Sequence, residues 1–162
     1  MRALSAENKC LAVVRIRGNT GISKEREEIL RQLHLTRKNH ATLLNSSPSV
    51  LGTLQRVKDY TTWGEVDQET VELLLRERGI LRGGQKLTEE RVKQSLRYES
   101  LGELAKSLYE GGVSLSGLES LKPVFRLHPP RKGFKGPINK PYPEGAIGYR
   151  KDMISSLLTK MV

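Results

Sequence analysis

The stretch Cys10-Leu-Ala-Val-Val-Arg-Ile-Arg17 decides the fold of this 162-residue chain. Its first residues are apolar and its last residues alternate between apolar and charged, which is the period-two pattern of a β-strand. This period places Ala12, Val14 and Ile16 on one face and the two arginines on the other. Because a charged side chain on a strand has to face water or a partner, we expect both arginines to point away from the core.

The sequence after this strand predicts two helices and two further strands. Following a turn at residues 18–21, Ser23 is placed to cap a helix that carries glutamates in its early turns. A second helix begins at Ser47-Pro48, a hydroxyl cap followed by proline at the first helical position. The short segments 41–44 and 60–63 are expected to be strands. The order βαβαβ predicts an α+β fold related to ferredoxin-like proteins, with one layer of two helices on a small three-stranded sheet.

The remainder of the chain divides into a helical region and a basic arm. Helix starts occur at Asp67, Thr88 and Ser100, and the last of them has a glutamate three residues later, as in a capping box. Most of the prolines follow, in a tract that cannot form a regular element, and an amphipathic helix comes after it. We therefore expect three parts: a βαβαβ core over 9–66, a helical region over 67–121, and an arm with its terminal helix over 122–162.

Charge is sorted along the chain into three blocks. Residues 9–58 carry ten lysines and arginines against three glutamates, and residues 122–151 carry eight against one. Residues 59–121, between them, carry eight basic and twelve acidic residues. The whole chain has a net charge of +10 and an isoelectric point near 9.9. Two basic surfaces flanking an acidic region indicate a phosphate backbone as the partner, because each neutralised phosphate releases condensed counterions.

Several other classes of function lack the residues that they need. A single cysteine, Cys10, excludes an internal disulfide framework and a cysteine-rich zinc site, and its place in an apolar strand indicates a buried, unreactive thiol. It also favours a reducing compartment, by default the cytoplasm. The histidines have neither acidic neighbours nor metal-ligand spacing, so we expect no metal, no cofactor and no catalysis. No apolar run has the length of a membrane span.

The tract over residues 126–143 is the most unusual segment, and it is a candidate for nucleic-acid contact. Basic residues alternate there with Phe134 and Tyr142, so the segment can follow a phosphate surface and stack an occasional ring on a base. A disordered linker is the alternative interpretation. The well-patterned helix that follows the tract favours the nucleic-acid contact.

A DNA-binding regulator is the alternative function. Residues 100–121 contain a helix, a Gly-Gly turn and a possible second helix, which is a weak helix-turn-helix pattern. The second segment, 113–121, carries none of the Arg, Lys, Asn or Gln residues that read base edges, and it is net acidic. An enzyme acting on RNA is a third class, but the sequence offers no set of acid, base or metal ligands for it.

Five segments together resemble a known family. They are Val14-Arg-Ile-Arg-Gly-Asn-Thr-Gly-Ile22, Leu33-His-Leu-Thr-Arg-Lys-Asn-His40, Asn45-Ser-Ser-Pro-Ser-Val-Leu-Gly-Thr-Leu-Gln-Arg-Val-Lys58, Tyr60-Thr-Thr-Trp-Gly-Glu65 and Phe125-Arg-Leu-His-Pro-Pro-Arg-Lys-Gly-Phe-Lys-Gly136. With them the chain is similar to the large-subunit ribosomal proteins called L-thirty in archaea and L-seven in eukaryotes. The resemblance covers essentially the whole chain, whereas the bacterial member is similar only to the core, roughly 11–65. The absence of a long basic extension before Met1 resembles the archaeal form.

The resemblance implies a structural component of the large ribosomal subunit, in the cytoplasm, without catalysis or membrane association. Its partners would be large-subunit ribosomal RNA near the 5S RNA, the 5S RNA itself and neighbouring ribosomal proteins. On the family's pattern, the turn at 17–24, the loop at 37–40 and the helix start at Ser47-Pro48 would face RNA. Together with the charge pattern, this gives the following residues as expected RNA contacts: Arg15, Arg17, Asn19, Ser23, Lys24, Arg26, Arg37, Lys38, Asn39, His40, Ser47, Arg56, Lys58, His128, Arg131, Lys132, Lys135, Lys140 and Arg150.

Overall fold

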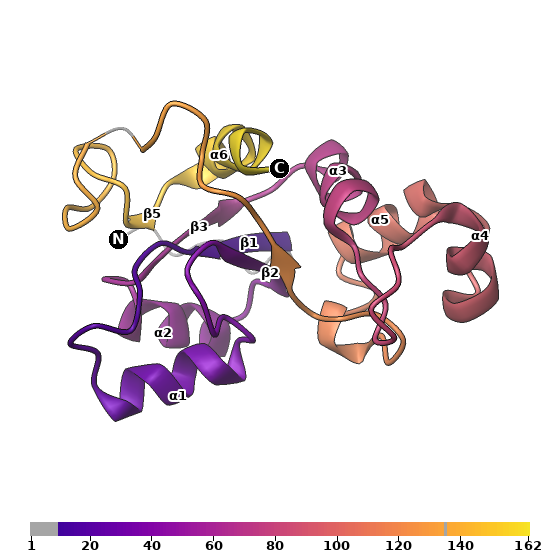
Figure 1. The fold of residues 1–162 in the computed structure, drawn as a ribbon, viewed down its shortest axis with the longest axis horizontal. Helices are drawn as coiled ribbons and strands as arrows, with labels where there is room; N and C mark the ends of the chain where they lie inside the picture. The colour runs from indigo at the N-terminus through magenta and orange to yellow at the C-terminus, as the bar shows by residue number, and fades with distance from the viewer. Residues whose placement is uncertain (1–9, 135) are drawn as a thin grey trace.

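The computed structural model describes residues 10–134 and 136–162, and within them one sheet carries helices on both faces (Figure 1). The strands are β1 (Cys10–Arg15), β2 (His40–Asn45), β3 (Thr61–Glu65), β4 (Phe125–Arg126) and β5 (Gly148–Tyr149). The helices are α1 (Lys24–Gln32), α2 (Pro48–Arg56), α3 (Gln68–Arg78), α4 (Glu89–Arg91), α5 (Leu101–Tyr109) and α6 (Ile154–Met161). Shorter turns are the π-helical η1 (Val92–Leu96) and the 3₁₀ segments η2 (Leu115–Gly117) and η3 (Lys151–Met153). The α+β class is therefore confirmed.

Strand β1 lies at the centre of the sheet because it is apolar on both faces up to its last residue. It pairs antiparallel with β2, where Leu11 lies opposite Leu44, and antiparallel with β3, where Leu11 lies opposite Glu65. Every residue of β1 is buried. A strand that is buried on both faces reads as a continuous apolar run, which is the pattern of its first five residues.

The arm supplies both edge strands, so the expected count of three strands is wrong. Within the described residues the sheet has five strands in the order β4-β2-β1-β3-β5. Phe125 of β4 lies opposite Ala41 in an antiparallel pair, and Tyr149 of β5 lies beside Trp63 in a parallel pair. Strands of two residues are too short to show a period in the sequence, and their position depends on pairing with distant segments. The arm thereby covers both edges of the central three strands.

Helices cover both faces of the sheet, which corrects the expectation of a single helical layer. Leu11 and Val13 pack with α1 and α2 around Trp63. The opposite face, which includes Ala12 and Val14, belongs to a larger core shared with α3, α5 and α6. Figure 1 shows α1 and α2 below the sheet and α6 above it. This larger core draws on the central strands, the helical region and the arm alike.

The predicted helix starts are confirmed. They could be predicted from the sequence because each depends only on local chemistry. A side-chain oxygen at each of these positions accepts a hydrogen bond from the backbone N–H three residues later, as an N-cap does. The five caps are Ser23, Ser47, Asp67, Thr88 and Ser100. Pro48 occupies the first turn of α2, as expected.

The structure does not contain the second helix that a helix-turn-helix requires. Helix α5 ends at Tyr109, and the following segment forms only the 3₁₀ turn η2 before it reaches the arm. Leu115 of this turn is buried in the larger core. The DNA-binding alternative is therefore wrong, because no recognition helix exists in this described segment to enter a groove. Among the described residues, no helix is both long and apolar enough to cross a membrane.

Candidate nucleic-acid interface

Arg15 is buried, which corrects the expectation that its side chain faces water or a partner. It lies on the predicted face of β1, but α1 and α2 cover that face, and only 1% of the residue is exposed. Its Nη1 donates to the carbonyl of Leu35 at 2.8 Å, its Nε donates to the carbonyl of Arg17 at 2.9 Å, and its Nη2 donates to Asn19 Oδ1. Burial lowers the pKa of the guanidinium, and the Glu27 carboxylate opposes this shift. Arg15 therefore fixes two loops from the inside.

Arg17 and Arg26 lie against one aromatic ring. The guanidinium carbon of Arg17 is 5.3 Å from the centroid of the Tyr60 ring, and that of Arg26 is 5.9 Å from it. Arg26 also pairs with Asp59 at 3.9 Å, and Arg17 Nη1 donates to the Asp59 carbonyl at 3.5 Å. Arg17 is half-buried and Arg26 is exposed. The ring and the neighbouring oxygens restrict both side chains while their charge stays accessible.

The turn that follows β1 places three further expected contacts next to this pair. Asn19 and Lys24 are exposed, although the Asn19 side chain accepts the hydrogen bond from Arg15. Ser23 is exposed, but its hydroxyl accepts a hydrogen bond from the Arg26 backbone at 3.4 Å as the cap of α1. Of these three residues only Lys24 is charged, and no hydrogen bond or ion pair of its side chain is found within the described residues.

The loop 37–40 is held beside the same end of the sheet. The Asn39 backbone N–H donates to the Arg15 carbonyl at 2.8 Å, and Asn39 adopts a φ of 67°. Arg37 and Lys38 project from the loop and are exposed. Burial lowers the pKa of His40, and the charges of Arg126, Arg37 and Arg15 lower it further, so its imidazole is neutral at pH 7. Asn39 Oδ1 and His40 Nδ1 are buried without a hydrogen-bond partner among the described residues.

Arg126 belongs to this surface, although it was not among the contacts expected from the sequence. It lies opposite His40 in the β2–β4 pair and is exposed, whereas its neighbours Phe125 and Leu127 are buried. The Leu127 N–H donates to the Asn39 carbonyl at 3.1 Å, which joins the arm to the loop 37–40. The sequence shows only one basic residue between two apolar residues here, which is too short a pattern to establish a strand.

Helix α2 separates Ser47 from Arg56 and Lys58, which are three more of the expected contacts. Because β1 and β2 are antiparallel, Asn45 lies beside Cys10, and Ser47 therefore follows at the end of the sheet opposite to Arg15. Ser47 accepts a hydrogen bond from the Val50 N–H at 3.2 Å as the cap of α2. At the other end of this helix Arg56 pairs with Glu25 of α1, and Lys58 is exposed. Ser47 is thus not gathered with the loop cations, whereas Lys58 is.

One end of the sheet therefore gathers cations from four chain segments. The hydrogen bonds between Ile16 and Tyr60, Asn39 and Arg15, and Leu127 and Asn39 join these segments. We call this surface the basic sheet end. Its cations are Arg17, Lys24, Arg26, Arg37, Lys38, Lys58 and Arg126.

The arm carries the remaining expected contacts in two different environments. His128, Arg131, Lys132 and Lys140 are exposed, whereas Lys135 lies outside the described residues. The arm is tied to α6, because the backbone N–H of His128 donates to the Met161 carbonyl at 3.0 Å and that of Arg131 to the Lys160 carbonyl at 3.1 Å. These bonds hold the cations of the arm beside the last turn of α6.

Arg150, the last of the expected contacts, is buried rather than exposed. Only 8% of the residue is exposed. Its Nε donates to Thr62 Oγ1 at 2.7 Å and its Nη2 to the Ala146 carbonyl at 2.6 Å, so it links β3 to the arm. Burial lowers the pKa of its guanidinium. The sequence shows a basic residue after a short extended segment, and nothing in that pattern reveals burial.

The described residues contain no group of three or more His, Cys, Asp or Glu side chains arranged to hold a metal ion. The acidic side chains of the helical region are spread over helix surfaces, where Glu72 pairs with Arg76 at 2.6 Å. Tyr149 donates from its hydroxyl to the Glu65 carboxylate at 2.6 Å, which ties β5 to β3. The polar groups therefore form a cationic surface and structural links between segments.

Comparison with known proteins identifies the family. Residues 11–61 match the family model described as ribosomal protein L30p/L7e. A protein of Archaeoglobus fulgidus named large ribosomal subunit protein uL30 is 49% identical over 150 residues, which is 93% of this chain and 98% of that protein. The chain belongs to the L30p/L7e family. Proteins with the same name from Methanopyrus kandleri and Methanosphaera stadtmanae are 45% and 44% identical, over 91% and 93% of this chain and 100% and 99% of their own lengths.

The two kinds of match cover different parts of this L30p/L7e chain. The family model ends at the first residue of β3, so it spans β1, α1, β2 and α2, which with their loops carry most of the basic sheet end. The archaeal relatives align over more than nine-tenths of the chain, which includes the helical region and the arm. Resemblance to the archaeal form, expected from five short segments, is thereby confirmed.

Proposed function

We propose that this chain is a structural component of the large ribosomal subunit, and that it binds ribosomal RNA through the basic sheet end without catalysing a reaction. The proposal rests on membership of the L30p/L7e family and on the names of the archaeal relatives, which are large-subunit proteins. The observation that carries the RNA contact is the convergence of cations from four separate segments on one end of the sheet. In this role the protein works in the cytoplasm, within the ribosome.

The geometry of these cations suits a phosphate backbone. Arg17 and Arg26 are ordered before binding by the Tyr60 ring, so less side-chain entropy is lost when they meet a phosphate. Arg37 and Lys38 extend from a loop that Arg15 fixes from the inside. A guanidinium on a rigid support can donate two parallel hydrogen bonds to one phosphate. Arg15 is in this scheme a positioning residue, and it does not touch RNA.

RNA is the polyanion that we propose because the archaeal relatives are named as ribosomal proteins. A ribose 2′-hydroxyl is a donor that RNA offers and DNA lacks. Contacts of this kind read the shape of the RNA and its sugars, so specificity comes mainly from RNA tertiary structure and little from base sequence.

The partners that we propose are large-subunit ribosomal RNA near the 5S RNA, the 5S RNA itself, and neighbouring ribosomal proteins. The family resemblance supports this choice. Nucleotide-resolution crosslinking from Lys38→p-benzoylphenylalanine in assembled large subunits provides the test. We expect crosslinks to 5S RNA or to the large-subunit RNA adjoining it. Crosslinks confined to RNA far from the 5S RNA contradict this location while leaving RNA binding itself intact.

The RNA contact is tested by removing two cations of the loop 37–40. We expect Arg37→Ala together with Lys38→Ala to weaken binding to deproteinised large-subunit RNA and to flatten the dependence of log affinity on log salt. The slope should fall in magnitude by about 0.7–0.9 for each phosphate that the protein no longer neutralises. Filter binding at several salt concentrations measures both quantities.

A matched control separates a local contact from the effect of net charge. Arg82→Ala together with Lys86→Ala removes the same charge from exposed positions in the helical region. We expect this variant to bind RNA nearly as the parent protein does. Equal losses in both variants mean that only overall charge matters, and that outcome contradicts a defined interface at the basic sheet end.

A further inference from the structure

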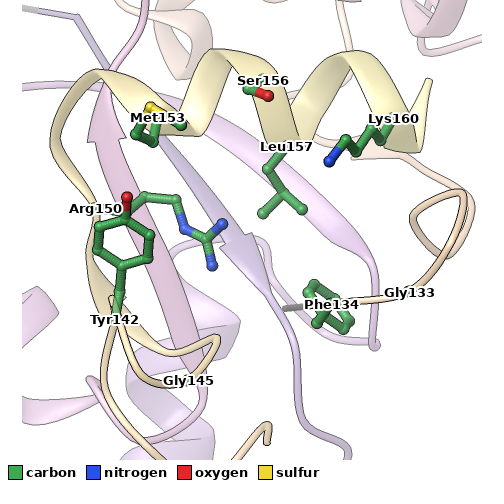
Figure 2. Close-up of a pocket in the computed structure, with 9 residues that line it drawn as sticks. All are labelled: Gly133, Phe134, Tyr142, Gly145, Arg150, Met153, Ser156, Leu157 and Lys160. Carbon is green, nitrogen blue, oxygen red and sulfur yellow. The ribbon is translucent and has the colours of Figure 1, made fainter. Parts of the chain in front are cut away.

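A small cavity lies between the arm and α6, and the basic sheet end does not include it. Its volume is about 100 Å³, and Figure 2 shows the residues around it. The walls come from two parts of the arm and from one face of α6. The lining residues that matter most are Phe134, Tyr142, Arg150, Ser156, Leu157 and Lys160. An apolar cavity of about 150 Å³ holds one benzene molecule, so this cavity has room for at most one six-membered ring and not for a whole nucleoside.

The cavity contains a guanidinium whose charge is not matched by an acidic partner. Arg150 makes its hydrogen bonds through Nε and Nη2 to a hydroxyl and a carbonyl, and no salt bridge to it is found within the described residues. Its Nη1 makes no hydrogen bond to any residue that the structure describes. Figure 2 shows the guanidinium directed into the space between Tyr142 and Leu157. The hydroxyl, the carbonyl and the Tyr142 ring already stabilise the buried charge. Nη1 is the remaining donor, and it suits a ligand with oxygen acceptors.

Aromatic and aliphatic surface surrounds this donor. The guanidinium carbon of Arg150 is 5.3 Å from the centroid of the Tyr142 ring, and Phe134 lies across the cavity with Leu157 above it. Planar rings bind between such surfaces by stacking and apolar contact. An anion alone, such as a free phosphate, would gain little from these walls. The lining therefore fits a flat heterocycle that carries carbonyl oxygens.

The rim of the cavity is cationic. Lys160 lines it and is exposed, and the carbonyl of Lys160 accepts the hydrogen bond from the Arg131 backbone. Lys132 and Gly133 follow in a turn in which the Gly133 N–H donates to the Pro130 carbonyl at 3.0 Å. Arg131 and Lys132, two exposed cations of the arm, thus lie near the rim. A phosphate attached to a ring in the cavity would lie among them.

We infer that this cavity binds a single unstacked pyrimidine nucleotide of RNA. The base enters between Tyr142 and Phe134, a carbonyl oxygen of the base accepts from Arg150 Nη1, and the phosphate lies at Lys160. This inference rests on the proposed function, because ribosomal RNA supplies the nucleotide. It adds a base-binding pocket to a protein whose other contacts, at the basic sheet end, are made to phosphate and ribose.

A mononucleotide tests the pocket independently of ribosomal RNA. Uridine 5′-phosphate is titrated into the ¹⁵N-labelled protein, and ribose 5-phosphate, which has no base, is titrated in parallel. We expect uridine 5′-phosphate to shift the amide signals of Gly133, Gly145 and Arg150, and ribose 5-phosphate to leave them nearly unchanged. Absence of these shifts overturns the inference. Equal shifts from both compounds overturn it too, because they show a phosphate site without a base pocket.

Two substitutions on α6 provide the matched variants. Ser156 lines the cavity and is exposed, so Ser156→Trp fills the space without replacing a core side chain. Thr159 is exposed on the same helix and does not line the cavity, so Thr159→Trp adds the same bulk elsewhere. We expect Ser156→Trp to abolish the uridine 5′-phosphate shifts and to weaken binding to deproteinised large-subunit RNA by about tenfold, the value of one stacked base. Thr159→Trp should change neither.

The outcomes separate this inference from the proposed function. If the parent protein binds uridine 5′-phosphate in the cavity but shows no salt-dependent binding to ribosomal RNA, the proposed function fails and the pocket stands. If ribosomal RNA binds and Ser156→Trp has no effect on either measurement, the pocket is overturned and the proposed function stands. Circular dichroism and thermal melts of both tryptophan variants establish that they fold.

Discussion

At the scale of single residues, two arginines on one strand face have different roles. The period of the predicted strand assigns Arg15 and Arg17 to the same side of the sheet, but β1 ends at Arg15 and Arg17 lies beyond it. Helices α1 and α2 cover Arg15, whereas Arg17 lies just past the strand end against the Tyr60 ring. Five donors in a planar group allow Arg15 to be buried among carbonyl and amide oxygens. Periodicity identifies the face of a strand and cannot show how far the covering helices extend.

Replacing Arg15 by alanine should destabilise the fold rather than weaken RNA binding directly. The change leaves the carbonyls of Leu35 and Arg17 without their donor and empties a buried position. We expect the free energy of unfolding to fall by about 2–3 kcal/mol in urea denaturation. Arg17→Ala is the control, for which we expect a loss of less than about 1 kcal/mol in stability and about 1–3 kcal/mol in RNA affinity. A stable Arg15→Ala protein with poor RNA binding contradicts this assignment.

The buried thiol of Cys10 makes stability depend on pH at the alkaline end. Burial raises the pKa of Cys10 from 9.0 to about 12, and the residue is 2% exposed. Between these two values the unfolded chain loses the proton while the native protein keeps it, so stability falls as pH rises. The expected contribution is a decrease of up to about 1.4 kcal/mol per pH unit in that window. Urea denaturation from pH 8 to 11 measures it, and Cys10→Ala should show a shallower decrease. Parallel curves for the two proteins contradict the burial of a neutral thiol.

At the scale of elements, the sequence predicts what local chemistry determines. The caps Ser23, Ser47 and Asp67 are correct because a hydroxyl or carboxylate, the next three residues and the helix period suffice to place a helix start. The sequence does not predict that β4 and β5 join the sheet, because a strand of two residues shows no period and its pairing depends on distant segments. The loops of the basic sheet end were predictable because, like the helix caps, they depend on residues that are close together in the sequence. The burial of Arg150 was not, because Thr62, its partner, is 88 positions away.

Close packing between β3 and η3 makes Gly64 irreplaceable. A Cβ at this position would collide with the backbone carbonyl of Lys151, which cannot move without displacing the arm. We expect Gly64→Ala to lower the free energy of unfolding by about 1–3 kcal/mol through overpacking. Gly52→Ala is the control, because no atom lies within 4 Å of its added Cβ in α2, and alanine should stabilise that helix by up to about 1 kcal/mol. Thermal denaturation of the two variants should show shifts of opposite sign.

At the scale of the whole molecule, the arm completes the fold and carries charge to a second surface. Its strands lie on both edges of the sheet, and α6 packs on the face that includes Ala12 and Val14. Removal of residues 122–162 should therefore expose the larger core instead of releasing a stable βαβαβ unit. We expect the truncated chain to bind an apolar dye such as ANS and to lose its cooperative thermal transition. A sharp transition without dye binding contradicts this dependence and shows that the core folds alone.

The two basic surfaces should each contribute to the binding of one RNA. Arg37 and Lys38 lie at the basic sheet end, and Arg131 and Lys132 lie beside α6, with the hydrogen bond from Leu127 to Asn39 holding the arm against the loop. If one RNA contacts both surfaces, alanine pairs at the two places lower log affinity additively, and each lowers the magnitude of the salt slope. We expect the fourfold variant to show the sum of the two effects in filter binding to deproteinised large-subunit RNA. Should the second pair have no effect once the first is removed, the surfaces do not engage the RNA independently. Should the second pair alone leave the salt slope unchanged, the arm lies outside the interface and only the basic sheet end binds.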